Sequence, residues 1–492
     1  MNVEDAAATA LAEADASFEI FRRAPAEARA RLLDAVAEEI LALGDDLLMT
    51  ADAETGLGLP RLTGERARTV NQLRLFASVV REGSWVDARI DTREPARTPP
   101  KPDVRRLLVP LGPVVVFAAS NFPLAFSVAG GDTASALAAG CPVVLRAHPA
   151  HPETSARVGA AVDAAVARCG LPAGVFSIFV GGGHEIGLSL VRHPLARAVA
   201  FTGSLQGGRA LFDAAAARPE PIPVYAEMGS TNPVFILPGA LAERGAALGT
   251  ALADSATVGT GQFCTKPGLI FAVEGAGFDA LSQALAARVG AKEPTRMLYG
   301  LLAERFRAGA TALAAAGVRR LAAAAEAAPP AGSPVAWEIS VDDFVATPSL
   351  REELFGPSTI LVRARSPEEL VRAAAALDGQ LTASVHGTAD DLAAAASLVA
   401  RLERKVGRLL FAGVPTGVEV CAAMNHGGPY PATTDARTTS VGTAAIHRFA
   451  RPLCFQDAPE AVLPPELRDH NARGVWRLVD NRLTRDDIGA GA

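Results

Sequence analysis

Cysteine is scarce in this chain of 492 residues. Only five are present, at positions 141, 169, 264, 421 and 454, and no two form a Cys-x-x-Cys pair. An odd number of widely spaced cysteines argues against a disulfide framework and against a zinc site. The first twenty residues carry acidic side chains among alanines, unlike a signal peptide. These features predict a soluble protein of a reducing compartment, the cytoplasm.

Aromatic residues and a strong excess of either charge are also lacking. Phe, Tyr and Trp make up 5% of the chain, so Ala, Val and Leu must fill the core. The 47 basic and 53 acidic residues give a net charge of −6 and are interspersed, without the basic stripe of a nucleic-acid binder. Hydrophobic residues reach 49%, which excludes disorder over most of the chain. At roughly 150 residues per domain, the length predicts two or three domains.

Charge is absent altogether from Leu107 to Gly131. A lipid-facing helix is excluded there, because the three prolines of this run would leave backbone groups unpaired in a bilayer. Continuous runs rich in valine are instead typical of buried parallel strands. We therefore predict a buried strand at 113–119, a turn, and a helix that begins near Leu124.

Strand and helix patterns alternate from residue 113 onward, and a second alternating region begins near Pro233. Such alternation predicts an α/β fold with parallel sheets. An extended, proline-rich segment is expected at 87–106, and a strand-like tail from 440. Helices expected from the spacing of apolar residues include 3–50, 61–81, 302–328, 367–377 and 389–404.

Cys264 stands in the sequence Thr-Gly-Gln-Phe-Cys-Thr-Lys-Pro-Gly, just after a predicted helix. A buried and inert thiol is the usual fate of a cysteine, and we expect it of Cys141, Cys169 and Cys454. A cysteine among loop residues differs, because loops carry reactive groups and a thiolate is a strong nucleophile near neutral pH. Cys264 is therefore the candidate nucleophile.

Glu227 and Asn121 each lie at the end of an apolar strand. Glu227 could be a solvated carboxylate on the rim, or a general base in a partly apolar pocket. Asn121 could form a turn before Pro123, or supply an amide to a developing oxyanion at the carboxyl end of its strand. The residues by themselves leave both pairs of alternatives open.

A glycine-rich turn follows the predicted strand that ends near Phe201. The chain there reads Phe-Thr-Gly-Ser-Leu-Gln-Gly-Gly-Arg, from Phe201 to Arg209. Backbone N–H groups at the start of a helix suit phosphate. The spacing differs from Gly-x-Gly-x-x-Gly, so the turn alone is weak evidence for a dinucleotide site.

Five motifs, in order along the chain, resemble those of the aldehyde dehydrogenase superfamily. The family pattern includes Asn-Phe-Pro, Phe-Thr-Gly-Ser, Glu-Leu-Gly-Gly-x-x-Pro, Gly-Gln-x-Cys and Glu-x-Phe-Gly-Pro. The matching segments here are Asn121-Phe122-Pro123, Phe201-Thr202-Gly203-Ser204, residues 227–233, Gly261-Gln262-Phe263-Cys264 and Glu353-Leu354-Phe355-Gly356-Pro357.

The resemblance covers nearly the whole chain and implies the fold of the family. That fold has a Rossmann-like cofactor domain, an α/β catalytic domain and a small β arm for oligomerisation. The expected parts are a cofactor domain at 1–88 and 111–229, an arm at 89–110 and 436–460, a catalytic domain at 230–435 and a tail at 461–492.

Further segments resemble one branch of the family, the α-ketoglutaric semialdehyde (2,5-dioxopentanoate) dehydrogenases. They are residues 228–233, 264–268, 415–420, 426–435 and 474–480. The resemblance implies NAD(P)-dependent oxidation of 2,5-dioxopentanoate to 2-oxoglutarate. The same branch holds NADP-dependent long-chain aldehyde dehydrogenases, so a long-chain or broad-specificity enzyme is the alternative. A homodimer or homotetramer is expected, with no nucleic-acid or membrane partner.

The resemblance also implies roles for particular residues. Cys264 would attack the aldehyde and form a thiohemiacetal and then a thioester. Asn121 and the Cys264 backbone N–H would stabilise the oxyanion, and Glu227 would activate the deacylating water. The residues implied in cofactor binding are Phe201, Gly203 and Ser204 at the pyrophosphate turn, with Glu353 and Phe355 at the nicotinamide ribose and ring.

One departure from the family pattern concerns the cofactor. Arg146 stands where the family commonly has a lysine that binds the adenosine ribose, and Pro149 replaces the usual acidic residue three positions on. Arg146, His148 and Arg209 could all face a 2′-phosphate. NADP is therefore expected, with NAD as the alternative. A capping or surface role for His148 is equally open.

The other histidines and the competing functions complete the expectations. His148 and His151 are too few for a metal site, and no metal is expected. His426 lies near the expected substrate channel, where a turn role is as open as a chemical one. A CoA-acylating relative would generally lack the water-activating glutamate, and a non-catalytic relative would lose the nucleophile, the amide or the carboxylate, all of which are present here.

Overall fold

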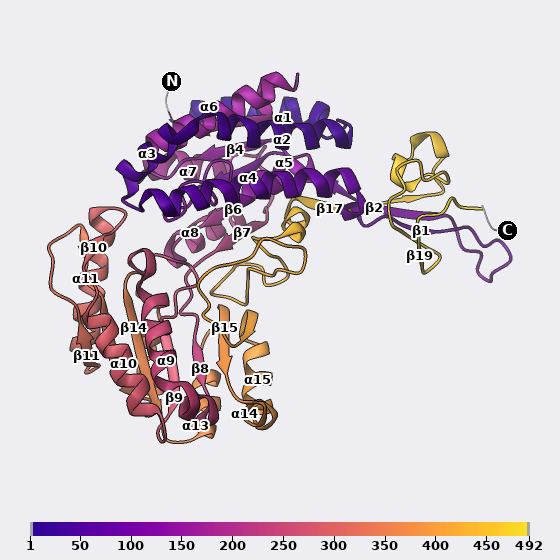
Figure 1. Ribbon diagram of the computed structural model, residues 1–492. Helices are drawn as coiled ribbons and strands as arrows, with labels where there is room; N and C mark the ends of the chain where they lie inside the picture. Colours follow the sequence, from indigo (N-terminus) through magenta and orange to yellow (C-terminus); the bar gives the residue numbers. More distant parts are fainter. Residues whose placement is uncertain (1–2, 490–492) are drawn as a thin grey trace.

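The computed structural model describes residues 3–489, which form two α/β bodies and a slender arm (Figure 1). Residues 1–2 of the expected cofactor domain and residues 490–492 of the expected tail lie outside this range. The two bodies are built on a five-stranded and a seven-stranded sheet, and the arm on a second five-stranded sheet. The predicted α/β fold with parallel sheets is confirmed by these strand pairings.

The first body has a fully parallel sheet in the order β5-β4-β3-β6-β7. Most strand residues are buried, as expected where helices cover both faces. The chain reverses its direction of strand addition between β3 and β6, which is where open sheets bind ligands beyond the carboxyl ends of their strands. The strands are β3 (Val114–Phe117), β4 (Val143–Arg146), β5 (Phe176–Phe179), β6 (Ala198–Thr202) and β7 (Val224–Glu227).

Helices on the two faces of this sheet bury alternate side chains of its strands. Val114 and Val116 pack among α2 to α6, whereas Val115 packs among α1, α7 and α8. The helices are α1 (Val3–Phe21), α2 (Ala26–Ala42), α3 (Gly44–Thr55), α4 (Leu59–Glu82), α5 (Gly131–Ala139), α6 (Pro152–Arg168), α7 (Gly183–Arg192) and α8 (Leu205–Ala216).

The second body has a sheet in the order β11-β13-β14-β9-β8-β15-β16, parallel except for β11. Its strands are β8 (Val234–Ile236), β9 (Leu269–Val273), β11 (Arg319–Ala323), β13 (Val335–Ser340), β14 (Ser358–Ala364), β15 (Gln380–His386) and β16 (Val406–Phe411), and a separate ribbon pairs β10 (Thr295–Arg296) with β12 (Ala331–Gly332). Its helices are α9 (Pro238–Thr257), α10 (Phe278–Gly290), α11 (Gly300–Ala315), α12 (Val341–Ala346), α13 (Pro367–Ala376), α14 (Ala389–Ala394) and α15 (Ala396–Glu403).

The arm leaves the first body and extends away from both bodies (Figure 1). Its strands follow the order β17-β2-β1-β18-β19. Two of them come from the segment expected as a separate tail, so this segment is part of the arm sheet. The strands are β1 (Arg89–Asp91), β2 (Val104–Pro110), β17 (Ala450–Gln456), β18 (Arg477–Val479) and β19 (Arg482–Thr484).

Short 3-10 turns link several of these elements. They are η1 (Ser84–Val86), η2 (Ala173–Val175), η3 (Val258–Gly261), η4 (Pro348–Arg351), η5 (Thr443–Phe449), η6 (Glu460–Val462) and η7 (Pro465–Leu467). The strand-like tail expected from residue 440 is therefore wrong in its first part, because η5 precedes the strand β17.

Some expected helices end or begin elsewhere, for reasons found in the tertiary structure. The helix expected near Leu124 begins at Gly131. Residues 123–130 form turns and bends instead, with the Leu124 and Ala125 N–H groups bonded to the Glu65 carboxylate of α4. The helix expected to reach residue 328 ends at Ala315, and Gly317 follows with φ +79°. The helix expected at 389–404 is interrupted at Ala395.

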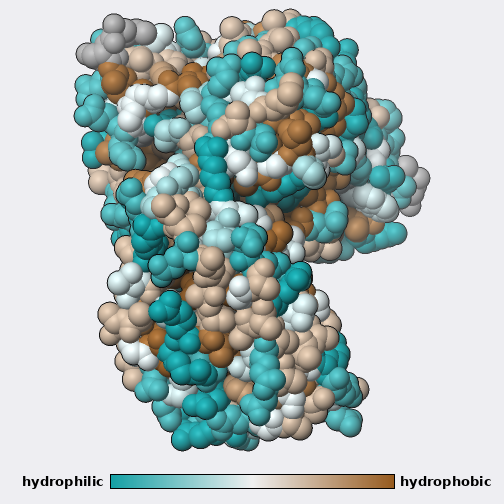
Figure 2. Space-filling view, turned by 60° about the vertical axis from the view of Figure 1, so that its left-hand side comes forward, coloured by the Kyte–Doolittle hydropathy of each residue, from teal (hydrophilic) through white to brown (hydrophobic). Residues whose placement is uncertain are grey.

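The surface of the bodies mixes polar and apolar residues without one dominant apolar area on the face in Figure 2. Among residues 3–489, no helix combines the length and apolar character needed to cross a bilayer. Cys141 is buried as expected, but Cys454 is exposed on β17, so the expectation of a buried thiol is wrong there.

Candidate active site

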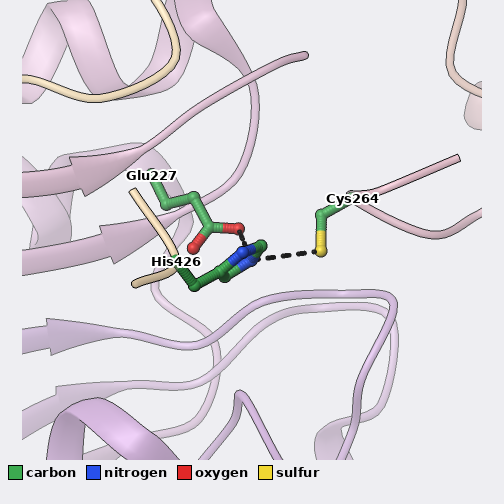
Figure 3. Close-up of side chains that lie close together, drawn as sticks. All are labelled: Glu227, Cys264 and His426. Carbon is green, nitrogen blue, oxygen red and sulfur yellow. Dashed lines mark hydrogen bonds and ion pairs between the residues drawn. The ribbon is translucent and has the colours of Figure 1, made fainter. Parts of the chain in front are cut away.

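Three side chains from distant parts of the chain meet where the two bodies join (Figure 3). His426 Nε2 lies 3.5 Å from Cys264 Sγ and 3.0 Å from Glu227 Oε1. Glu227 is the last residue of β7, Cys264 lies in the loop between η3 and β9, and His426 lies in the irregular segment after β16. The imidazole therefore stands between the candidate nucleophile and the candidate base.

The loop that carries Cys264 is bent sharply before it reaches the thiol. Gly259, Thr260 and Gly261 all have φ near +60°. A β-carbon at Gly261 would lie 2.2 Å from the Gly356 carbonyl oxygen, so only glycine permits this approach. The Thr260 hydroxyl bonds to Thr295 at 2.8 Å, which helps to hold a residue in an unfavourable conformation. The bend brings the Cys264 loop against the Glu353–Pro357 motif.

Side-chain amides hold the backbone on both sides of the thiol. Asn232 Nδ2 donates to the Cys264 carbonyl at 2.8 Å and to the Lys266 carbonyl at 3.0 Å. Gln262 Oε1 accepts from the Leu298 N–H at 3.0 Å. These bonds fix the orientation of Cys264 before any substrate binds, which is the preorganisation that a catalytic site needs.

The buried contact between His426 and Glu227 is an ion pair. Burial alone would raise the pKa of Glu227, but the His426 charge and hydrogen bonds from His426 and Ser440 outweigh it and hold this pKa below its usual value. Burial would lower the pKa of His426, but Glu227 and Cys264 raise it to about 10. The imidazole of His426 therefore lies between the carboxylate of Glu227 and the thiol of Cys264.

Asn121, the predicted oxyanion donor, contacts the same loop. Its Nδ2 donates to the Gln262 carbonyl at 3.0 Å, two residues before Cys264. Its own carbonyl accepts from Arg61 Nη2 at 2.6 Å. Asn121 is buried, and it follows β3 at the carboxyl edge of the parallel sheet.

The turn after β6 is tied to the strand that carries Glu227. The Gly203 N–H donates to the Glu227 backbone carbonyl at 3.0 Å, and Ser204 Oγ accepts from the Gly207 N–H at 3.2 Å as the cap of α8. The ring of Phe201 fills the inside of the turn, because a β-carbon at Gly203 would lie 2.5 Å from it. The first residues of α8 and its cap, Ser204, are exposed.

The three residues expected at a 2′-phosphate differ in charge and in partners. Arg146 donates to the carbonyls of Ala147 and Gly183. Arg209 pairs with Asp213 at 2.7 Å. His148 accepts from the Ala150 N–H at 3.1 Å, and burial lowers its pKa to about 3, so it carries no charge at neutral pH. This contact lies within the loop that precedes α6.

Glu353 has the environment of a ligand-binding carboxyl group. The residue is partly buried, and burial raises its pKa to about 7 although Lys266 lowers it. Its Oε1 has no hydrogen-bond partner among the described residues. An unsatisfied buried oxygen fits the hydroxyl groups of a cofactor ribose. Phe355 lies partly buried against the core of the second body.

The sequence left a turn role and a chemical role equally open for His426. Its place in a motif near the expected channel was the available signal, but no spacing along the chain shows that it reaches Glu227, which is 199 positions earlier. The contact arises because the segment around His426 pairs with β7, through Met228 N–H to the Ala432 carbonyl at 2.8 Å and a bridge between Glu227 and Thr433. The donor atoms of Glu227, Cys264 and His426 all lie within 4.8 Å of one another, so they could also hold a cation.

A sequence model of the aldehyde dehydrogenase family matches residues 2–297. This chain belongs to the aldehyde dehydrogenase family. α-Ketoglutaric semialdehyde dehydrogenase 2 of Azospirillum brasilense is 54% identical over 471 residues, which cover 95% of this chain and 89% of that protein. α-Ketoglutaric semialdehyde dehydrogenase of Acinetobacter baylyi is 44% identical over 462 residues, which cover 93% and 88%. The predicted activity, oxidation of an aldehyde, is confirmed.

Solved structures share the fold of this aldehyde dehydrogenase at low sequence identity. Glyceraldehyde-3-phosphate dehydrogenase GapN of Methanocaldococcus jannaschii, complexed with NADP, has a TM-score of 0.78 at 18% identity and covers 92% of this chain and 94% of its own. A mutant of aldehyde dehydrogenase C of Pseudomonas syringae, complexed with NAD+ and octanal, has a TM-score of 0.77 at 20% identity and covers 93% and 90%. These neighbours confirm the predicted fold class. The family uses NAD(P).

The charge on His426 can be tested through the reactivity of Cys264. His426→Gln should slow alkylation of Cys264 by iodoacetamide at pH 7 by about tenfold or more, because a neutral amide no longer stabilises the thiolate. The rate would be followed by mass spectrometry of the peptide that carries Cys264. His184→Gln, at an exposed histidine, is the matched control. An unchanged alkylation rate in His426→Gln would show that His426 does not supply the charge.

Proposed function

We propose that this aldehyde dehydrogenase oxidises 2,5-dioxopentanoate to 2-oxoglutarate, with Cys264 as nucleophile. The observation that carries the catalytic role is the contact of Cys264 with His426 and, through it, with Glu227. The substrate is supported by two relatives named α-ketoglutaric semialdehyde dehydrogenases that match most of the chain.

A substrate panel tests this proposal. kcat/KM for 2,5-dioxopentanoate should exceed that for succinic semialdehyde and for long-chain aldehydes by about tenfold or more, with Cys264→Ser as the inactive control. A higher kcat/KM for long-chain aldehydes would replace the proposal with the alternative, a long-chain or broad-specificity enzyme.

The first step in the proposed mechanism is attack on the aldehyde carbon. His426 stabilises the Cys264 thiolate, which adds to the carbonyl and forms a thiohemiacetal. The negative charge then lies on the former carbonyl oxygen. Asn121 Nδ2 and the Cys264 backbone N–H are the donors near that oxygen, and one such donor typically contributes a factor of roughly 10²–10³ in rate.

Oxidation of the thiohemiacetal needs a hydride acceptor. Bound NAD(P) would supply it, with Glu353 and Phe355 at its nicotinamide side and the turn of Phe201, Gly203 and Ser204 at its pyrophosphate. The chain fits this group through the unsatisfied Glu353 Oε1 and the open N-terminus of α8. Loss of the hydride leaves a thioester on Cys264.

Glu227 has its role in the hydrolysis of that thioester. Glu227 accepts the proton of a water that attacks the thioester carbon, and collapse of the tetrahedral intermediate breaks the C–S bond, frees the Cys264 thiolate and releases the acid. Ser440, which donates to Glu227 Oε2, orients the carboxylate for this step.

Glu227→Gln should separate the two halves of the reaction. The amide cannot accept a proton from water, whereas hydride transfer precedes that need. A burst of NAD(P)H close to one per active site should therefore persist in stopped-flow absorbance, while steady-state turnover falls by about 10²-fold or more. An equal loss of burst and turnover would assign Glu227 to an earlier step.

NADP is the cofactor that we propose this enzyme prefers. Arg146 and Arg209 lie near the carboxyl ends of β4 and β6, and Pro149 replaces a residue that in this family is often acidic. Arginine binds a phosphate through paired, charge-assisted hydrogen bonds. Asp213 now holds Arg209, so a 2′-phosphate must compete with this carboxylate.

That competition gives a two-sided test. Arg209→Ala should weaken NADP by about 1.5–3 kcal/mol, a factor of roughly 10 to 150, and leave NAD nearly unchanged. Asp213→Asn should have the opposite sign and strengthen NADP, because it frees the guanidinium. Fluorescence titration of both cofactors measures the effects. Equal losses of NAD and NADP in Arg209→Ala and Arg146→Ala would remove the basis for NADP preference.

The arm is proposed to join subunits into a homodimer or homotetramer. Large apolar side chains are exposed on it, including Leu483 at 67% and Val462 at 62%. An exposed apolar surface on a projecting sheet edge is typical of a subunit contact.

We also propose residues 1–88 and 111–229 as the cofactor domain and 230–435 as the catalytic domain. All five cysteines are free thiols, which supports a cytoplasmic location.

A further inference from the structure

Two arginines of helix α4 have hydrogen-bonding groups that the protein leaves unused near Cys264. Arg61 and Arg68 are seven positions apart, so they lie on the same face of the helix. The buried Nη1 of Arg61 and the buried Nε and Nη2 of Arg68 have no hydrogen-bond partner among the described residues. Buried donors are normally satisfied, so each of these groups requires an explanation.

Aromatic rings cover the faces of both guanidinium groups. Arg61 lies 4.5 Å from the ring centroid of Phe263, the neighbour of Cys264, and 4.8 Å from that of Phe122. Arg68 lies 5.0 Å from the centroid of Phe126. The aromatic rings contact the faces of the two guanidinium groups and so fix their planes. The N–H groups point outward from the edges, which is where a ligand would bind.

The positive charge near Cys264 is only partly neutralised by the protein. Glu65, between the two arginines on α4, directs Oε1 to the Leu124 and Ala125 N–H groups, and its Oε2 is 4.0 Å from Arg61 Nε. Burial lowers the pKa of Arg61 and of Arg68. The charge of Cys264 raises both of these pKa values, so the thiol and the two cations are within electrostatic reach of one another.

The unused atoms of Arg68 form one edge of its guanidinium group. Nε and Nη2 together make the fork that binds both oxygens of a carboxylate. Elsewhere on the same helix, Arg81 uses this edge to hold the Glu27 carboxylate, at 2.9 and 3.0 Å. The edge of Arg68 that could bind a carboxylate therefore has no partner among the described residues, whereas the same edge of Arg81 is paired.

We propose that Arg68, with Arg61 beside it, forms an anion-binding subsite. This subsite binds the carboxylate of a short aldehyde acid while the aldehyde group of that acid reaches Cys264. The identity of that acid rests on the proposed function. Arg61 has a second task, because its Nη2 supports the Asn121 carbonyl. Arg68 makes no such backbone contact among those found in the structure, so its substitution is the cleaner test.

A third arginine near Cys264 has a different role. Arg408 donates to the Pro415 carbonyl at 2.8 Å and the Gly417 carbonyl at 3.1 Å. The Gly417 N–H in turn bonds to Thr265 Oγ1 at 3.3 Å. Arg408 thus positions a loop beside the residue after Cys264, and it is a positioning residue rather than part of the subsite.

The subsite predicts a change in discrimination between acidic and neutral aldehydes. The ratio of kcat/KM for 2,5-dioxopentanoate to that for pentanal should fall by about 10- to 100-fold in Arg68→Met, which keeps an apolar stem against Phe126. Arg68→Lys should restore the ratio only in part, because an ammonium group lacks the fork. Arg74→Ala, at an exposed arginine of the same helix, is the matched control and should keep the wild-type ratio.

A second measurement does not depend on the identity of the substrate. Glutarate, an unreactive five-carbon dicarboxylate, should compete with pentanal in the wild-type enzyme, and its inhibition constant should rise about tenfold or more in Arg68→Met. Competition by glutarate together with poor oxidation of 2,5-dioxopentanoate would retain the subsite and overturn the proposed substrate. Glutarate inhibition that is absent in the wild type, or equal in wild type and variant, would overturn the subsite.

Discussion

The buried ion pair of His426 and Glu227 is the interaction around which the site is organised. Both side chains are almost fully enclosed, and a lone charge in such a place would cost several kcal/mol. Each group therefore reduces the free-energy cost of burying the charge of the other. The thiol of Cys264 contacts the same imidazole nitrogen. The proposed nucleophile and the proposed base consequently contact the same ring, as Figure 3 shows.

Much of the surrounding structure holds these three residues in place. The Thr439 hydroxyl accepts from the His426 N–H at 2.8 Å, and Ser440 bonds both to Glu227 and to the His426 carbonyl. The same irregular segment pairs with β7 of the first body through Ala432. The contact between the two bodies and the assembly of the active site therefore depend on the same residues, so neither is expected to form without the other.

Electrostatics also explains why scarce aromatic residues gather at this point. Phe makes up only 20 of 492 residues, yet Phe122, Phe126 and Phe263 contact one another or the arginines of α4. Rings over a guanidinium group remove water from its faces while offering partial compensation for its charge. In the proposed subsite, a negatively charged substrate would balance the charge of these two arginines.

The local features of this enzyme could be inferred from its residues alone. The strands at 113–119 and 143–146 follow from runs rich in valine, and Cys264, Glu227 and Asn121 could be selected because strand ends and glycine-rich loops carry reactive groups. The motifs that resemble aldehyde dehydrogenases identified the family and the fold. Periodicity could not place the start of α5, because residues 123–130 form turns whose contacts, such as that of Glu65 with the Leu124 and Ala125 N–H groups, come from another helix.

Only the tertiary structure determined which charged side chains contact one another. His426 is 199 positions from Glu227 and 162 from Cys264, and no pattern along the chain joins them. The loss of charge on His148, the pairing of Arg209 with Asp213 and the unused fork of Arg68 likewise depend on burial and on neighbours across elements. The physical reason is that propensity and periodicity act over a few residues, whereas desolvation and Coulomb energy depend on distance in space. The residue types and their order thus determined the family and the candidate nucleophile, and the packing of the two bodies determined which side chains that nucleophile faces.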